Sequence, residues 1–247
     1  MRLRGKVAIV TGAAKGIGAA IAEACVREGA RVAVLDLDEG GVESVASTLT
    51  GRGADVLALR ADVTRSADID RALAAVVARW DRIDILVNNA GGFAVIRATE
   101  EIAEEEWHAI LASNLTSVFL CSKAVLPIMK RQRYGRIVNL ASVVGRAGAV
   151  RVTSHYAAAK AGVIGFTRHL ALEVGADGIT VNAVAPGTTA TDACSGPARQ
   201  RRRSGWPKPF PCAGWASRRR SPRRLSSSPL IRPRSSTEPP LTSTAAR

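Results

Sequence analysis

The sequence predicts an α/β protein with a doubly wound parallel β-sheet and helices on both faces. Two observations predict it. Short apolar segments alternate with segments of helical composition as far as residue 184, which is the pattern of a parallel sheet. The first apolar segment also runs into a glycine-rich turn that opens a helix. Ligands of such sheets bind at the carboxyl ends of the strands, so we expect the site there.

The expected strands are short runs rich in Val, Ile, Leu and Ala. They cover residues 6–10, 31–35, 56–59, 83–87, 137–140 and 180–184. The expected helices are longer, and several are rich in Ala. They cover residues 19–28, 40–49, 66–80, 100–111 and 153–174, and a long helical stretch that contains residue 114 reaches residue 131.

Length and composition favour a globular protein. The chain has 247 residues, of which 47% are hydrophobic, so it can bury a large core. We see no run of 18 apolar residues and no signal peptide before the first strand, and therefore expect no membrane span and a cytoplasmic protein. The four cysteines, Cys25, Cys121, Cys194 and Cys212, lack metal-ligand spacing.

The net charge of +14 is concentrated in the C-terminal tail. Residues 1–194 hold 22 basic and 20 acidic residues, whereas residues 195–247 hold 13 and 1. The first part therefore has an ordinary, nearly neutral surface. A basic tail can bind nucleic acid, but it carries no motif that reads bases, and we expect no nucleic-acid partner.

The glycine-rich turn has the spacing G-x-x-x-G-x-G, with Gly12, Gly16 and Gly18 as its glycines and Lys15 and Ile17 between them. Such a turn lets backbone amides and a helix N-terminus approach a pyrophosphate. The alternative is a simple strand-to-helix turn.

The next strand ends at Asp36, where a carboxylate can accept hydrogen bonds from the adenosine ribose. Because Asp36 would repel a 2′-phosphate, it favours NAD over NADP. Lys15 favours NADP instead, because a cation at that position could bind the 2′-phosphate. We give more weight to Asp36 and expect NAD as the cofactor, while NADP stays possible.

Tyr156 and Lys160 are four residues apart in an expected helix and share one of its faces. A neighbouring ammonium stabilises a phenolate, so we expect Lys160 to lower the pKa of Tyr156 and fit the phenol for proton exchange with a substrate oxygen. A serine from the preceding loop could orient that oxygen. In isolation, such a pair usually decorates a solvated helix face.

Taken together, these motifs resemble the short-chain dehydrogenase/reductase family over residues 5–192, and we take residues 1–192 as one Rossmann-type catalytic domain. The resemblance rests on the glycine turn, Asp62, Asn88 to Gly91, Asn114, Ser142, Tyr156 with Lys160, and Pro186-Gly187, in the family's order. It implies reversible hydride transfer between a nicotinamide cofactor and a secondary alcohol or ketone.

The resemblance also implies residue roles. Tyr156 would be the general acid/base, Lys160 would hold the nicotinamide ribose, Ser142 would bind the substrate oxygen and Asn114 would support a relay water. Asp62 and Val63 would contact the adenine. The remaining residues implied for cofactor binding are Asn89, Ala90, Gly91, Pro186, Gly187, Thr189 and Thr191.

After Asp192 the family pattern stops. Residues 193–247 form a basic tail, and its part from residue 195 holds 9 of the 11 prolines, a composition typical of disorder. A constant shift of reading frame in GC-rich codons would restore family-like segments, so we interpret the tail as out of frame from about residues 191–194. The last family strand and the helix before it would then be missing.

This interpretation leaves two functions open. The first is an oxidoreductase that uses NAD(H) on 3-oxoacyl thioesters, sugars, polyols or steroid-like alcohols; the second is an inactive, poorly folded product that retains only its nucleotide-binding residues. The family usually forms homotetramers or dimers, and the altered tail puts one of those interfaces in doubt.

Overall fold

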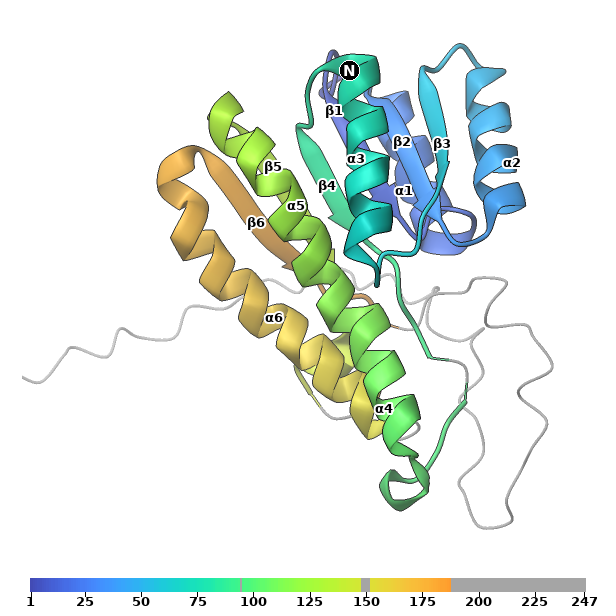
Figure 1. The fold of residues 1–247 in the computed structure, drawn as a ribbon, viewed down its shortest axis with the longest axis vertical. Helices are drawn as coiled ribbons and strands as arrows, with labels where there is room; N and C mark the ends of the chain where they lie inside the picture. Colours follow the sequence, from blue (N-terminus) through green and yellow to red (C-terminus); the bar gives the residue numbers. More distant parts are fainter. Residues whose placement is uncertain (94, 148–151, 188–247) are drawn as a thin grey trace, which may run out of the picture. The chain divides into compact units, whose positions relative to one another are not determined.

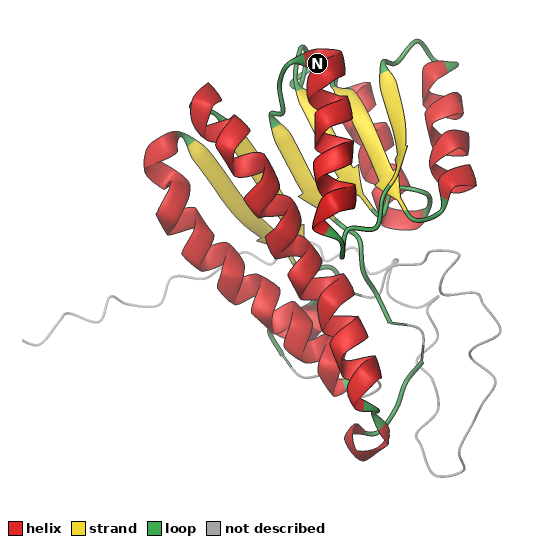
Figure 2. Ribbon diagram, viewed as in Figure 1, coloured by secondary structure: helices red, strands yellow, loops and turns green. Residues whose placement is uncertain are grey.

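A computed structural model of the chain describes residues 1–93, 95–147 and 152–187. All of these lie in one compact unit, Met1–Pro209, and the second unit, Phe210–Arg247, lies outside the described residues. The described part is an α/β layer structure in which helices flank a parallel sheet (Figures 1 and 2).

The sheet has the strand order β3-β2-β1-β4-β5-β6, and every neighbouring pair is parallel. The chain winds outward from β1 in one direction and then, from β4, in the other. The crevice between β1 and β4 is therefore the topological switch point, where such sheets bind ligands. The strands are β1 (Val7–Thr11), β2 (Arg31–Asp36), β3 (Val56–Arg60), β4 (Ile85–Asn88), β5 (Gly135–Leu140) and β6 (Ile179–Val184).

The helices confirm the expected alternation, and α3 has the expected bounds. They are α1 (Gly16–Arg27), α2 (Glu39–Thr50), α3 (Ser66–Trp80), α4 (Glu104–Leu111), α5 (Ser117–Gln132) and α6 (Ser154–Val174). The expected start of a helix at residue 100 is wrong, because a 3-10 turn (Thr99–Glu101) and an extended Ile102 precede α4. Three glutamates in the first turn of α4 suit the positive end of its dipole.

Side chains that alternate along each strand build two cores. On one face, Val7 and Ile9 pack with residues of α3, α5 and α6, including Val76 and Val125. On the other face, Ala8, Val10 and Val32 pack with α1 and α2. This alternation is the period-two pattern of a strand buried on both sides.

The two faces of β6 differ. Ile179 and Val181 are buried, whereas Thr180 and Asn182 are exposed, and within the described part of the chain β6 pairs only with β5. The expected loss of a further strand and helix concerns residues beyond 187, which lie outside the described part of the chain, so it stays a prediction. An exposed strand edge is also a place where chains can pair.

The stretch Glu104–Gln132 is one continuous helical segment that is long and apolar enough, by length and composition, to cross a membrane. The sequence analysis expected no such segment. A third of its most apolar window is buried in the protein. In this fold Val118, Cys121, Val125 and Met129 of the stretch belong to the buried core. Core helices of soluble proteins pass the same test, so the segment is weak support for a membrane span.

Candidate active site

The glycine turn lies at the carboxyl end of β1, and its residues Gly12 and Gly18 have no room for a side chain. Gly12 has a φ of +65°, and a Cβ there would lie 2.7 Å from the Cα of Ala90. A Cβ on Gly18 would lie 2.6 Å from Nδ2 of Asn89 and would also meet the carbonyl oxygen of Gly12. Gly16 has a φ of +59°. Glycine is therefore required at these positions by close packing and by left-handed backbone.

The helix that follows begins without a side-chain cap. Lys15 occupies the N-cap position of α1 in extended conformation, and its side chain makes no capping hydrogen bond. Lys15 and Gly16 are exposed, and Ile17 is partly exposed. The first N–H groups of a helix need external acceptors, so this end of α1 suits an anionic phosphate.

Asn89 clamps the glycine turn to β4. Its Nδ2 donates to the carbonyl oxygens of Thr11 and Gly12 at 3.0 and 2.9 Å, and Thr11 Oγ1 accepts from the N–H groups of Asn89 and Ala90, both at 3.0 Å. Nδ2 of Asn89 is thus used in hydrogen bonds to the glycine turn.

Two predicted adenosine-side residues lie at the ends of the next strands. Asp36 accepts hydrogen bonds from the N–H groups of Ala14 and Asp38 at 3.1 and 3.2 Å, so it also orders the glycine turn. Asp62 follows β3, and its Oδ1 accepts from the N–H and the hydroxyl of Thr64. The side chain of Val63 packs in the core, which leaves its backbone as the part that could reach a ligand.

Asn114 lies in a π-helical turn (Ala112–Thr116) that the sequence analysis did not anticipate. It is fully buried, its Oδ1 accepts from the N–H of Gly92 at 2.8 Å, and its Nδ2 donates to the carbonyl oxygens of Gly92 and Ile110. Gly91 has a φ of +128°, and a Cβ on it would collide with Asn114 Oδ1. The side chain therefore anchors the β4–α4 loop, and π turns are frequent at functional sites.

Ser142, Tyr156 and Lys160 come together at the carboxyl end of β5. Ser142 caps a short 3-10 turn (Val143–Gly145) and is near enough to Tyr156 for hydrogen bonding to lower the pKa of the phenol. Lys160, one turn along α6, has its Nζ 5.6 Å from the centroid of the Tyr156 ring. A Cβ on Gly145 would lie 2.6 Å from the backbone of Lys160, so this glycine lets the serine loop lie against the helix.

The expected effect of Lys160 on Tyr156 is not seen. Burial raises the pKa of Tyr156, and the hydrogen bond with Ser142 only partly opposes this rise. Lys160 donates instead to the carbonyl oxygen of Leu140 at 2.7 Å, and burial lowers the pKa of Lys160 to about 8. In this structure desolvation outweighs the neighbouring charge, because the ammonium points to a backbone acceptor rather than to the phenol oxygen.

The end of β6 reaches the same place. The N–H of Val143, next to Ser142, donates to the carbonyl oxygen of Pro186 at 3.1 Å, and Gly187 follows. Thr189 and Thr191, which were predicted to bind cofactor, lie outside the described residues.

Four residues near the site were missed by the sequence analysis. The ring of Phe93 lies against Tyr156 with centroids 4.6 Å apart. His155 is fully buried beside Tyr156, and it connects to Glu106, which pairs with Arg97. The contacts of Phe93 with Tyr156 and of Glu106 with His155 join segments 49 or more residues apart, so no local pattern marks them; only the position of His155 next to Tyr156 was a signal.

The comparisons with known proteins agree with this geometry. A family model described as short chain dehydrogenase matches residues 6–201. The chain belongs to the short-chain dehydrogenase/reductase family. It is 45% identical over 192 residues to the 3-oxoacyl-[acyl-carrier-protein] reductase FabG of Escherichia coli, covering 78% of this chain and 77% of the relative.

Two solved structures share the fold. One, from Burkholderia xenovorans and described as a short-chain dehydrogenase/reductase, is 40% identical with a TM-score of 0.75 and covers 78% of each chain. The other, levodione reductase, is 38% identical with a TM-score of 0.74 and covers 77% of this chain and 74% of its own. The family assignment confirms the predicted fold class and makes the protein an oxidoreductase that acts on CH–OH or ketone groups.

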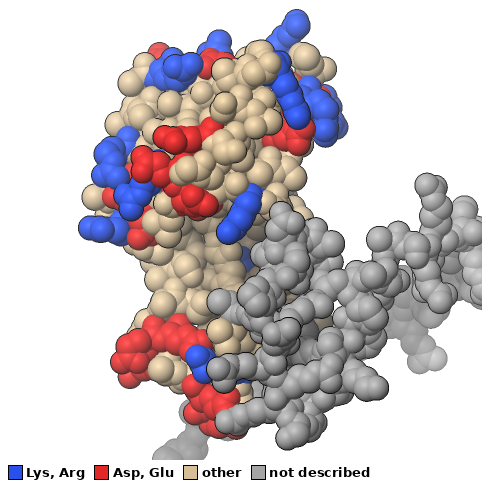
Figure 3. Space-filling view, turned by 90° about the vertical axis from the view of Figure 1, so that its right-hand side faces the viewer, with Lys and Arg blue, Asp and Glu red and all other residues tan. Residues whose placement is uncertain are grey.

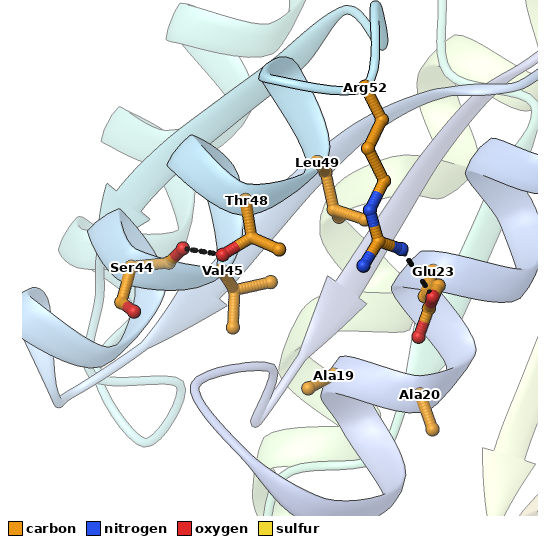
Figure 4. Close-up of a pocket in the computed structure, with 8 residues that line it drawn as sticks. All are labelled: Ala19, Ala20, Glu23, Ser44, Val45, Thr48, Leu49 and Arg52. Carbon is orange, nitrogen blue, oxygen red and sulfur yellow. Dashed lines mark hydrogen bonds and ion pairs between the residues drawn. The ribbon is translucent and has the colours of Figure 1, made fainter.

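A surface depression of about 240 Å³ between α1 and α2 contains none of the predicted site residues (Figure 4). Arg52 and Glu23 form an ion pair across it at 2.6 Å. The remaining lining residues are Ala19, Ala20, Ser44, Val45, Thr48 and Leu49. Its walls are the facing sides of α1 and α2.

Proposed function

We propose that this protein transfers hydride reversibly between NAD(H) and a ketone or secondary alcohol, with Tyr156 as general acid/base. One observation carries the proposal: Ser142, Tyr156 and Lys160 converge at the carboxyl end of β5. Tyr156 is a proton donor beside a second hydroxyl, that of Ser142, which is what polarising a carbonyl oxygen requires.

The glycine cradle supports a dinucleotide. Gly12 and Gly18 leave no room for side chains, and the uncapped end of α1 offers N–H groups to a pyrophosphate. Asp36 lies at the end of β2 with its carboxylate toward the turn, where it would accept from the adenosine ribose and disfavour a 2′-phosphate. Asp62, Val63, Asn89, Ala90 and Gly91 would line the adenine and ribose side.

When bound, the nicotinamide supplies or accepts the hydride. In ketone reduction Ser142 would donate a hydrogen bond to the substrate oxygen while Tyr156 delivers the proton. Lys160, cationic below a pKa of about 8, would hold the ribose. The side-chain donors of Asn114 are used on Gly92 and Ile110, so its relay water would bind through the main chain.

The substrate class we propose is a 3-oxoacyl thioester. Its support is the 45% identity to a protein named 3-oxoacyl-[acyl-carrier-protein] reductase. The test is reduction of acetoacetyl thioesters by NADH and NADPH, followed at 340 nm, beside a panel of sugars, polyols and steroid alcohols. Turnover of the thioester with NADH supports the proposal; turnover of the polyols alone, or with NADPH alone, contradicts it.

The tail is the second part of the proposal. The family match ends at residue 201, and we propose that the altered composition of residues 193–247 reflects a reading frame shifted near residues 191–194. Resequencing of the codons for residues 188–247, with the intact mass of the expressed protein, tests this against 25.9 kDa. A frame error would support a cytoplasmic, homo-oligomeric enzyme with a family-like C-terminus. An unaltered sequence and mass would favour the inactive alternative, which the NADH assay detects directly.

A further inference from the structure

A chain of charged and polar contacts connects the start of α6 to the loop that follows β4. His155 is fully buried, with Nδ1 2.9 Å from Thr153 Oγ1 and Nε2 3.3 Å from Glu106 Oε1. The other carboxylate oxygen of Glu106 accepts from Nε of Arg97 at 2.8 Å. Glu106 therefore joins the helix that carries Tyr156 to the loop that carries Arg97.

The partners determine the tautomer of His155. A carboxylate can only accept, so Nε2 carries a hydrogen, and in the neutral ring Nδ1 then accepts from the hydroxyl of Thr153. Both ring nitrogens are thus used, and the ring cannot turn without losing a bond in a buried site. Its orientation is fixed directly beside Tyr156.

The loop connected in this way carries apolar side chains, one of which contacts Tyr156. Phe93, four residues before Arg97, stacks on the Tyr156 ring at 4.6 Å. Val95 and Ile96 are 47% and 49% exposed, and Val143, next to Ser142, is 44% exposed. A second contact, Thr99 Oγ1 to Ser154 Oγ at 3.2 Å, also ties this loop to α6.

The surroundings of Arg97, Glu106 and His155 are acidic. The first turn of α4 contains Glu104, Glu105 and Glu106, and Figure 3 shows acidic side chains gathered at the lower end of the molecule, the level of α4 in Figure 1. Of these three, Glu106 bridges His155 and Arg97, whereas Glu104 pairs with the exposed His108 on its own helix. Position in the fold, and not charge alone, distinguishes Glu106.

We propose that Arg97, Glu106 and His155 form a brace that holds Phe93 against Tyr156, and that this apolar wall selects ketones whose carbonyl carries an apolar substituent. This inference rests on the proposed function, because it concerns the substrate of the same site. A hydroxyl placed against Phe93 would lose its hydrogen bonds to water without replacement, whereas an ethyl group would gain contact. The three brace residues act through Phe93 and Tyr156, so they are positioning residues.

The first test compares two isosteric thioesters, 3-oxopentanoyl and 4-hydroxy-3-oxobutanoyl, in the full chain. We expect the parent to prefer the ethyl substrate by about tenfold or more in kcat/KM. Glu106→Gln leaves one acceptor for two donors, so it should remove most of that preference through KM, with kcat changed less than about threefold. Glu104→Gln, which makes the same charge change on the same helix, should change neither.

The conservative variants of His155 supply a rescue. Gln can replace the Nε2–H donor toward Glu106, whereas Asn replaces only the Nδ1 side. His155→Gln should therefore keep more of the selectivity than His155→Asn, and this pair carries the test if Glu106→Gln does not fold. Equal loss in both, or a fall of kcat for both substrates alike, would overturn the brace.

A second readout needs no turnover. The chain has only two tyrosines, so ring-labelled Tyr156 is assigned by NMR with Tyr134→Phe. Stacking on Phe93 should shift its ring resonances, and Phe93→Leu should remove the shift. Glu106→Gln should reduce the shift and Glu104→Gln should not; an unchanged shift in Glu106→Gln overturns the proposal. A parent that reduces neither thioester refutes the proposed function while this measurement still decides the brace.

Discussion

The two halves of the site are built from different parts of the chain. On the nucleotide side, around β1, β2 and α1, backbone amides and glycines do most of the shaping, and the side chains of Asn89 and Asp36 serve to order the turn. On the catalytic side, around β5 and α6, buried side chains with specific partners do it, as Lys160 and Tyr156 show. The first half should therefore be sensitive to added volume, and the second to lost polar atoms.

The largest effect is expected on the catalytic side. Tyr156→Phe removes one hydroxyl and should lower kcat by about a thousandfold, within the range for a lost general acid. NADH affinity, measured by fluorescence, should change little, because the cradle is untouched. Tyr134→Phe is the control, since Tyr134 stacks under Lys6 away from the site. Residual activity close to the parent would exclude Tyr156 as the proton donor.

On the nucleotide side, the addition of a single methyl group should weaken cofactor binding. Gly18→Ala places a Cβ against the Gly12 carbonyl and Asn89, so we expect NADH binding at least about tenfold weaker and a loss of about 1–3 kcal/mol in unfolding free energy. Gly40→Ala, where a Cβ meets nothing within 4 Å, should leave binding intact. Calorimetric titration and urea unfolding measure both. Normal binding by Gly18→Ala would mean that the cradle is not used.

A charge on the nucleotide side sharpens the comparison. Asp36→Asn keeps the acceptor for the Ala14 N–H but removes the negative charge. We expect the ratio of kcat/KM for NADPH to that for NADH to rise about tenfold, or about 1.4 kcal/mol. An unchanged ratio would show that Asp36 does not face the ribose.

Lys160 makes stability depend on pH. Burial lowers its pKa from 10.5 to about 8, so between these values the unfolded chain binds a proton that the folded chain does not. Stability from this group therefore rises with pH through the window, with a slope of up to about 1.4 kcal/mol per unit. Chemical denaturation from pH 7.5 to 10.5 should show this rise in the parent and lose it in Lys160→Met. Parallel curves would refute the burial effect.

The smallest effect is expected for a residue outside both halves of the site. Arg52→Ala breaks the pair with Glu23 between α1 and α2, but both side chains are at least half exposed. Surface pairs contribute about 0.5 kcal/mol or less, so thermal unfolding should shift by about 2 °C at most, and turnover should not change. A larger shift, or a loss of activity, would give the depression in Figure 4 a role that its geometry does not indicate.

The sequence by itself determined the alternation of strands and helices, the glycine turn and the Tyr156–Lys160 pair. These are local features, because strand and helix periodicity, a left-handed glycine and an i,i+4 spacing are properties of neighbouring residues. The bounds of α3 were predicted for the same reason. The false helix start at residue 100 shows the limit, since composition does not separate a 3-10 turn from the first turn of α4.

The tertiary structure alone decided what those residues touch. It buries Tyr156, and this burial raises the pKa of the phenol instead of lowering it, while Lys160 donates to the carbonyl of Leu140. It places Asn114 under Gly92, and Glu106 between His155 and Arg97. Apart from the Arg97–Glu106 pair, these contacts join segments 20 or more residues apart, and the balance of burial against charge exists only once the chain has closed around them.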